Sequence, residues 1–208
     1  MAFAIDIEGR QYLVTAKHVV EGIQSGDAIL IASLKGQHAL SVTVIPVEPA
    51  GADSIVLVLP ELIAKGDQPE PDMAGLAISQ DVFFLGFPFA WTPKMKTLDT
   101  PFPLPFVKGG VVSALENQPH TGPTFFIDGQ SNIGFSGGPV IFDDVGVGEQ
   151  KLKIAGIVHG NVAVEEPVSD IGGDTGLHVM GDAGLIKVFG LRPVLAAIEK
   201  NPIGVPTE

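Results

Sequence analysis

Glycine and proline punctuate this chain so often that they argue against long helices. The 208 residues include 26 glycines and 17 prolines, and both residue types mark turns and interrupt helices. Between them stand short runs rich in valine and isoleucine, which are typical of strands. With 45% hydrophobic and 17% charged residues, the chain can bury a substantial core. The pattern predicts an all-β domain of many short strands joined by tight turns.

The expected strands fall into two groups separated by a connection. Residues 60–80 are richer in proline, glycine and acidic side chains, which favours a surface connection between two units. We therefore expect one unit over residues 1–75 and another over residues 76–208, together making one domain, with a short amphipathic helix at residues 192–200. The strand-like runs are residues 2–7, 11–15, 28–32, 39–45 and 55–59 in the first unit, and 81–86, 110–115, 124–127, 138–142, 152–158 and 176–180 in the second.

The run Gly134-Phe135-Ser136-Gly137-Gly138 places a serine between glycines. Such a run is common in hairpin turns, so by itself it indicates only a loop. Two other segments make it a candidate nucleophile. His18 follows an apolar run and Asp53 precedes another, so the chain holds a base and a carboxylate that could activate the serine.

The chain order of His18, Asp53 and Ser136 resembles that of trypsin-like serine peptidases of the chymotrypsin fold. The α/β-hydrolase order places the histidine last and the subtilisin order places the aspartate first, so neither fits. The cysteine-free HtrA-type peptidases are the most similar group, because residues 85–89 and 109–114 match their Gly-x-Pro-x and Gly-x-Val-Ser segments. The resemblance spans about residues 2–190. It implies two antiparallel six-stranded β-barrels, and we expect no appended PDZ-type module.

The resemblance also implies a role for each of the three residues. A serine hydroxyl is protonated at neutral pH, so His18 would take its proton as attack occurs. Asp53 would hold the histidine in the correct tautomer and stabilise the imidazolium. The main-chain amides of Gly134 and Ser136 would donate to the oxygen anion of the tetrahedral intermediate. We expect a serine endopeptidase, with a catalytically silent or partner-activated peptide-binding module on the same fold as the alternative.

Phe135 departs from the family pattern. Secreted trypsin-like enzymes carry an aspartate before the serine, and HtrA-type members usually carry an asparagine. Phenylalanine can make neither set of polar contacts, so the loop around Ser136 would have to be ordered by packing of Phe135 or by an outside ligand. Activity that depends on release of a new N-terminus is not expected.

The substrate-binding expectations rest on the same resemblance. Gln130 stands six residues before Ser136, where trypsin carries an acidic residue, so we expect a small or medium apolar side chain before the scissile bond. Residues 156–161 would form a wall along which an extended substrate pairs. We expect His159 to contact Asp53 and His178 to face the same pocket. The candidate substrate-binding residues are Gln130, Ile133, Val158, His159, Gly160 and His178.

Composition limits the remaining functions. A net charge of -12 argues against nucleic acid as a partner, and no apolar run is long enough to cross a membrane. The chain has no cysteine, and its histidines are scattered, so we expect no metal site and no cofactor. Residues 169–174 are expected to be a solvated turn. The expected partners are a peptide or protein substrate and an activating partner or oligomer; without a visible signal peptide, a cytoplasmic location is preferred.

The stretch from Phe87 to Lys108 alternates aromatic residues with prolines. A connection of this length without regular structure is uncommon in a compact domain and is often functional. We expect this loop to fold onto the barrel, with a substrate or partner surface as the alternative.

Overall fold

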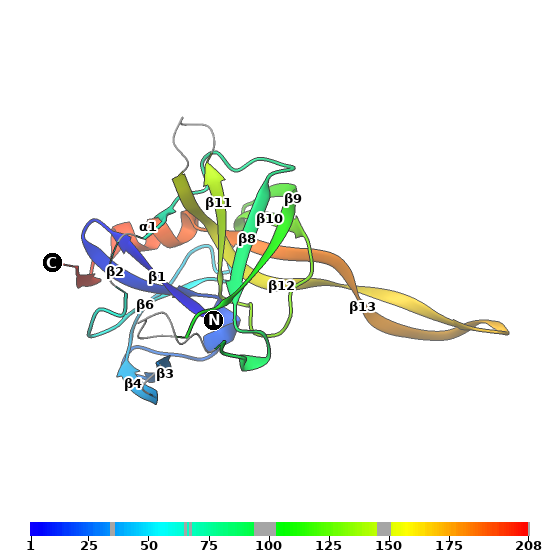
Figure 1. Ribbon diagram of the computed structural model, residues 1–208, viewed down its shortest axis with the longest axis horizontal. Coiled ribbons are helices and arrows are strands. Elements are labelled where there is room, and N and C mark those ends of the chain that lie inside the picture. Colours follow the sequence, from blue (N-terminus) through cyan, green and yellow to red (C-terminus); the bar gives the residue numbers. More distant parts are fainter. Residues whose placement is uncertain (34–35, 65, 67, 94–102, 145–150, 208) are drawn as a thin grey trace.

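The computed structural model describes residues 1–33, 36–64, 66, 68–93, 103–144 and 151–207. Within this part of the chain, α1 is the only α-helix, and strands make up most of the structure (Figure 1). The elements are β1 (Ala2–Ile7), β2 (Arg10–Thr15), η1 (Lys17–Val20), β3 (Ala28–Ser33), β4 (Gly36–Ser41), β5 (Thr43–Ile45), β6 (Ile55–Val58), β7 (Glu70–Pro71), β8 (Asp81–Gly86), η2 (Pro88–Ala90), β9 (Phe106–Gln118), β10 (Gly122–Asp128), β11 (Pro139–Asp144), β12 (Lys151–Asp170), β13 (Gly173–Gly190), α1 (Arg192–Lys200) and β14 (Val205–Pro206).

The N-terminal strands form an antiparallel sheet in the order β1-β2-β6-β5, with β14 also paired to β2. Among the described strands, β3 and β4 pair only with each other. Apolar packing joins this hairpin to the sheet, since Ile29, Ile31 and Leu40 contact a cluster that includes buried Leu13 and Leu57. The described pairings of this half therefore make a sheet plus a packed hairpin, whereas we expected one ring of six strands.

The second sheet has the order β11-β8-β9-β10-β13-β12-β7, and β12 also pairs with β11. Six antiparallel strands therefore pair in a closed ring, in the order β11, β8, β9, β10, β13 and β12. The interior of this ring is filled by buried apolar side chains such as Phe84, Phe125 and Phe142. The all-β class predicted from the sequence is confirmed.

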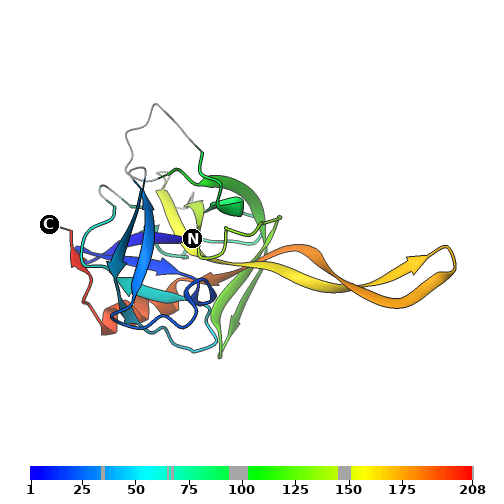
Figure 2. The same cartoon turned by 90° about the horizontal axis from the view of Figure 1, so that it is seen from below.

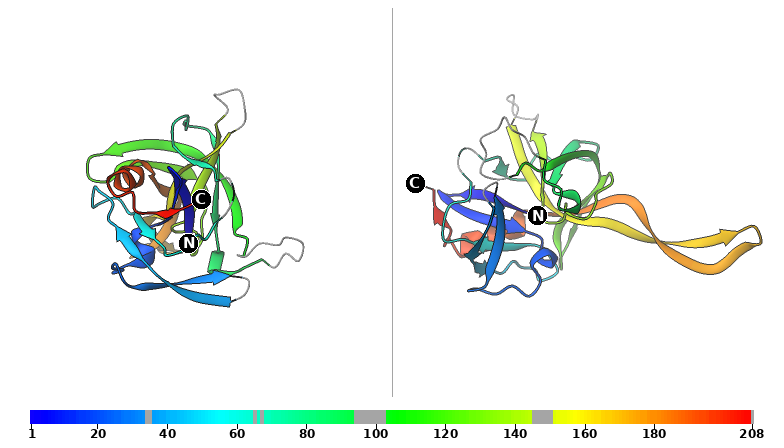
Figure 3. Two further views of the ribbon diagram at one scale, coloured as in Figure 1. Left: turned by 90° about the vertical axis from the view of Figure 1, so that its left-hand side faces the viewer. Right: turned by 60° about the horizontal axis from the view of Figure 1, so that its bottom comes forward.

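A third cluster joins the two sheets. Ile5 and Val14 of the first sheet lie in one core with Ile157 and Phe189 of the second, and with buried residues of α1. Figure 3 shows the ribbons of the two sheets and of α1 from two further sides. The C-terminal segment also crosses over, because β14 pairs with β2 of the first sheet. The other strands of the first sheet precede residue 75, and those of the second sheet follow it, except for β7, which precedes residue 75 and pairs with β12. The division into two units at that residue stays a prediction.

Strands β12 and β13 are the largest departure from the sequence prediction. We expected strands at residues 152–158 and 176–180, but they extend over Lys151–Asp170 and Gly173–Gly190. They leave the body as a long two-stranded ribbon (Figures 1 and 2). The predicted turn at residues 169–174 is its tip. The sequence did not predict this extension because the ribbon contains proline and glycine, which ordinarily weaken strands. The predicted helix has the expected bounds, and no described helix is long and apolar enough to span a membrane.

Candidate active site

Neighbouring strands bring His18 and Asp53 together. His18 lies in η1 directly after β2, and Asp53 stands just before β6; the two strands pair with Thr15 opposite Ile55. The Asp53 carboxylate contacts His18 twice. Its Oδ1 accepts from the His18 main-chain N–H at 3.0 Å, and its Oδ2 lies 2.6 Å from His18 Nδ1. The ring is therefore held by Nδ1, which leaves Nε2 available for acid–base chemistry.

His159 of β12 contacts the same carboxylate oxygen. Its Nδ1 lies 2.5 Å from Asp53 Oδ2, and its ring meets the His18 ring edge to face with centroids 5.1 Å apart. This confirms the expected contact between His159 and Asp53. The sequence did not reveal that two histidines share one oxygen, because His18 of η1 and His159 of β12 are more than a hundred residues apart in the chain.

The histidines set the charge state of Asp53. Burial by itself would raise the pKa of Asp53, but hydrogen bonds from His159 and His18 outweigh it and lower the pKa from 3.8 to about 2. Only 15% of the Asp53 side chain is exposed, whereas His18 and His159 are about two-fifths exposed. Asp53 is therefore a carboxylate at neutral pH, facing an accessible imidazole.

His18, Asp53 and His159 are spaced as hydrogen-bonded groups. The ligand-type atoms of His18, Asp53 and His159 lie within 4.8 Å of one another, so their residue types could hold a cation. However, the nitrogen–oxygen distances are 2.5 and 2.6 Å. Donor atoms that share a zinc ion are more than about 3 Å apart, because each lies about 2 Å from the metal. The arrangement thus fits protons between the groups, with both imidazoles donating from Nδ1.

The loop before β11 places Ser136 beside β12. Ser136 Oγ donates to the main-chain oxygen of His159 at 2.8 Å. The loop is held there because Gly137 N–H donates to Val158 at 2.8 Å and Val158 N–H donates to Gly138 at 2.9 Å. No hydrogen bond joins Ser136 to His18 among the described residues. A hydroxyl has one hydrogen, so attack through His18 requires Ser136 to rotate away from His159.

The peptide between Ile133 and Gly134 has a defined orientation. The Ile133 oxygen accepts from Phe89 N–H at 2.9 Å, and the Gly134 oxygen accepts from Phe87 N–H at 3.0 Å. Because a peptide is planar and trans, the Gly134 N–H points away from Phe89. Gly134 has φ +109°, and a Cβ there would lie 2.0 Å from the Phe87 oxygen, so no other residue fits without moving this segment.

The peptide between Phe135 and Ser136 is anchored in the same way. The Phe135 oxygen accepts from Gly138 N–H at 2.9 Å, so the Ser136 N–H points in the opposite direction. Within the described residues, neither the Gly134 amide nor the Ser136 amide donates to a protein acceptor. Both amides are therefore available to an outside oxygen.

Phe135 orders the loop by packing. Its side chain is fully buried and meets Phe84 edge to face with centroids 5.3 Å apart. Gly86 makes room for it, since a Cβ at that position would lie 2.5 Å from the Phe135 ring. Lys108 Nζ lies 5.8 Å from the ring centroid. Of the two ways of ordering the loop that the sequence left open, the structure shows the packing of Phe135.

Asn161 bridges the two segments expected to form the substrate side-chain pocket. Its Oδ1 accepts from Ser131 N–H at 3.1 Å and from Ser131 Oγ at 2.6 Å, and its Nδ2 donates to the Ser131 oxygen at 3.1 Å. The same Nδ2 also donates to Asp182 at 2.5 Å. No local pattern in the sequence distinguishes Asn161, because Ser131 and Asp182 are distant from it in the chain.

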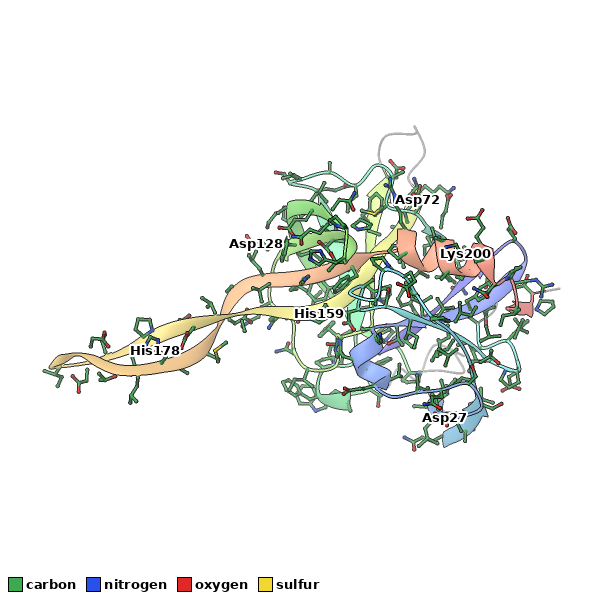
Figure 4. All side chains as sticks on the ribbon, turned by 180° about the vertical axis from the view of Figure 1, so that it is seen from behind. Asp27, Asp72, Asp128, His159, His178 and Lys200 are labelled. Carbon is green, nitrogen blue, oxygen red and sulfur yellow. The ribbon has the colours of Figure 1, made fainter. Side chains whose placement is uncertain are left out.

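The other candidate substrate residues have different positions. Gln130 and Ile133 are exposed in the segment that leads to Ser136, with Ile133 81% exposed, and Gly160 lies next to Ser136. Two predictions are corrected. Val158 is fully buried in the core, and both its main-chain groups bind Gly137 and Gly138, so it supports the serine loop. His178 lies on the β12–β13 ribbon 3.6 Å from Glu165, away from the labelled His159, because it belongs to the outer part of β13 (Figure 4).

The aromatic loop is described in part. Phe89 and Trp91 are 58% and 65% exposed and pack against each other, with ring centroids 6.1 Å apart. We expected these aromatics to fold onto the barrel, and these two instead face solvent. Phe106 lies at the start of β9, and Phe102 lies outside the described residues.

A family model described as a trypsin-like peptidase domain matches residues 1–147. The chain belongs to the trypsin-like peptidases. A comparison with curated proteins found no match. The family membership and the β-rich fold agree with the resemblance predicted from the sequence.

Solved structures with a similar fold include HtrA-type proteases. The HtrA-type protease AlgW, as a serine-to-alanine variant with a decapeptide, is similar with a TM-score of 0.61 and 18% identity, over 96% of this chain and 51% of that chain. An inactive serine-to-alanine form of Rv3671c from M. tuberculosis H37Rv has a TM-score of 0.58 and 18% identity, over 98% and 83%. This trypsin-like peptidase domain spans about half the length of the AlgW chain.

Proposed function

We propose that this chain is a serine endopeptidase that hydrolyses peptide bonds through His18, Asp53 and Ser136. The observation that carries the proposal is the double contact of Asp53 with His18, through the main-chain N–H and through Nδ1. This contact orients the ring as a general base needs, with Nε2 free. The low pKa of Asp53 keeps a negative charge beside the imidazolium that forms during attack.

In the proposed reaction, Ser136 rotates from the His159 oxygen toward His18 and attacks the substrate carbonyl carbon. His18 takes the hydroxyl proton and then donates it to the leaving amine, which gives an acyl-enzyme. Water then attacks the acyl carbon while His18 takes its proton, and His18 returns that proton to the Ser136 oxygen as the acid is released. The Gly134 and Ser136 amides would stabilise the tetrahedral oxygen anion. Their orientation by Phe89 and Gly138 supports this role, because preorganised donors need no rearrangement during the reaction.

His159 is proposed to position Asp53. It contacts the same carboxylate oxygen as His18, so it limits rotation of the carboxylate and adds a second donor to it. Its main-chain oxygen holds Ser136 in the resting arrangement. His159 would thus act through Asp53 and Ser136 and need not contact the scissile bond.

The bridge between Asn161 and Ser131 supports a narrow substrate pocket. The resemblance places the side chain preceding the scissile bond between these two segments, and the bridge fills the space between them. We therefore propose a preference for a small side chain, such as that of alanine, at this substrate position.

The nucleophile assignment is tested with a fluorophosphonate probe and with Ser136→Ala. The wild type should be labelled at Ser136, and Ser136→Ala should lose labelling and at least about a thousandfold of peptide hydrolysis, with little change in melting temperature. Ser113→Ala, at an exposed serine of β9, is the matched control and should retain both. Undiminished hydrolysis by Ser136→Ala would refute the assignment.

The second candidate is a silent or partner-activated peptide-binding module. The bond from Ser136 Oγ to the His159 oxygen favours it, because the hydroxyl hydrogen is directed away from His18. Folded protein that resists the probe under conditions that label a control peptidase would support this candidate. A labelling rate that rises on adding peptides would identify partner activation, and a rate that never rises would identify a silent module.

A further inference from the structure

The outer parts of β12 and β13 form an arm, here defined as residues 162–183, that extends from the body (Figure 4). Every residue from Ala163 to Met180 is exposed. The arm is held mainly by its own strand pairing, with Val168 opposite Leu177 near the tip. An isolated two-stranded hairpin is at best marginally stable in water. A second surface would therefore stabilise it.

One edge of β12 is open from the candidate nucleophile outward. On this edge, β11 pairs with β12 as far as Ile157, and Gly137 and Gly138 then bind Val158. Ser136 Oγ contacts the next residue, His159, through its main-chain oxygen. Beyond that point, no other described strand pairs with this edge. The open edge of the arm is thus continuous with the site of Ser136.

Pro167 sets the outer limit of this edge. Proline has no N–H, so within a paired strand its nitrogen faces the unpaired edge. Pro167 pairs with His178 of β13, so the opposite, open edge of β12 has no donor at this position. The edge available to an added strand therefore runs from His159 to Glu166. Eight residues of strand span about 26 Å.

The arm is acidic and partly apolar. The sequence has no lysine or arginine between Lys153 and Lys187, and its acidic residues there are Glu165, Glu166, Asp170, Asp174 and Asp182. The strand register places Val164, Val168, Leu177 and Val179 on one face, and all four are exposed, Leu177 by 66%. Two arms of this charge would repel each other. The surface is complementary to a partner that alternates apolar and basic side chains.

We propose that the arm is a substrate exosite: beyond the wall expected at residues 156–161, a basic, extended segment of the substrate continues as an antiparallel strand along the open edge of β12 as far as Glu166. Antiparallel pairs are the more stable and the commoner kind. Because β12 runs outward, an antiparallel segment runs inward, so the bound residues precede the scissile bond. The proposal rests on the proposed function for the position of that bond.

Binding is measured without cleavage, in the full chain carrying Ser136→Ala. Fluorescein-labelled peptides of about twelve residues alternate valine with lysine, or valine with glutamate. The lysine peptide should bind about tenfold more tightly, and salt should reduce the difference. Adding Glu165→Lys and Glu166→Lys should abolish the preference.

The matched control has the same change of charge away from the arm. Glu8→Lys with Glu61→Lys, at exposed positions, should keep the preference for lysine. Equal binding of the two peptides, or a preference that survives the arm substitutions, would overturn the proposal. Dimerisation in sedimentation that the arm substitutions abolish and the lysine peptide does not displace would assign the edge to a second copy and would also overturn it.

Hydrolysis tests the direction of the bound segment. Extending a short substrate by valine–lysine repeats on the side preceding the scissile bond should lower KM about tenfold, and the same extension on the other side should not. A lower KM only for the extension that follows the scissile bond would overturn the antiparallel arrangement. If no substrate is cleaved and Ser136 is not labelled, the proposed function fails, while the binding measurement still decides whether the edge is a peptide site.

Discussion

The inner and outer halves of β12 form one continuous strand but have opposite surroundings. From Lys153 to Val158 every residue is buried, and from Ala163 to Asp170 every residue is exposed. The inner half contacts β11 and the serine loop, whereas the outer half pairs only with β13 among the described strands. Near their junction lies His159, which contacts both Asp53 and Ser136. One strand therefore supports the candidate catalytic residues at one end and offers a free edge at the other.

The largest effect is expected in the inner half. Ile157→Ala should lower the free energy of unfolding by about 2 to 5 kcal/mol, because Ile157 is fully buried in the core that joins the two sheets. Urea denaturation of wild type and variant measures this difference. A loss below about 0.5 kcal/mol would show that the inner half is less tightly packed than its burial indicates.

The next effect lies at the junction and depends on pH. The pKa of Asp53 is about 2 in the folded protein against 3.8 ordinarily, which corresponds to about 2 kcal/mol of stability. This contribution is present above the ordinary pKa and is lost as the pH falls toward 2. The wild type should therefore lose about 2 kcal/mol more than Asp53→Asn between pH 5 and 2, measured by denaturant titrations.

The control for that titration is Asp128→Asn, which removes a carboxylate from an exposed position. Its acid sensitivity should follow that of the wild type. Parallel curves for wild type and Asp53→Asn would contradict the assigned hydrogen bonds from His18 and His159.

A smaller effect is expected from the bridge beside the junction. Asn161→Gly removes the bonds to Ser131 and should open the pocket. The ratio of kcat/KM for substrates with leucine rather than alanine before the scissile bond should rise about tenfold. Asn117→Gly, at an exposed position of β9, should leave the ratio unchanged. An unchanged ratio in Asn161→Gly would place the specificity elsewhere.

The smallest effect belongs to the outer half. Val168→Ala should change the free energy of unfolding by no more than about 0.5 kcal/mol, because Val168 lies near the tip of the exposed arm and is 37% exposed. The same urea titration serves for both halves of β12. A cost comparable with that of Ile157→Ala would mean that the arm packs against another surface in solution.

Local patterns were sufficient for most strands and for the helix. Alternating or continuous apolar runs between turns located β1, β2, β6 and β8, and α1 has its predicted bounds. The predicted run at residues 39–45 is divided into β4 and β5 around buried Val42. The arm was missed because its length depends on pairing across the hairpin, which outweighs the unfavourable Pro167 and several glycines.

In the candidate site, too, local patterns predicted some features and contacts between distant residues decided the others. Chain order and residue type singled out His18, Asp53 and Ser136, since these depend on the local chemistry of each segment. The shared oxygen of His18 and His159, and the bridge from Asn161 to Ser131, join residues distant in the chain. No pattern of local spacing encodes such contacts.

By itself, the sequence determined the β-rich class, the family, and which side chains are the candidates for base, carboxylate and nucleophile, because composition and short motifs encode these properties. Only the tertiary structure decided how the glycine-rich loop around Ser136 is ordered. Burial of Phe135 against Phe84, with Gly86 leaving room for its ring, contributes packing that orders this loop. That outcome depends on the shape of the core, which forms only when distant strands meet.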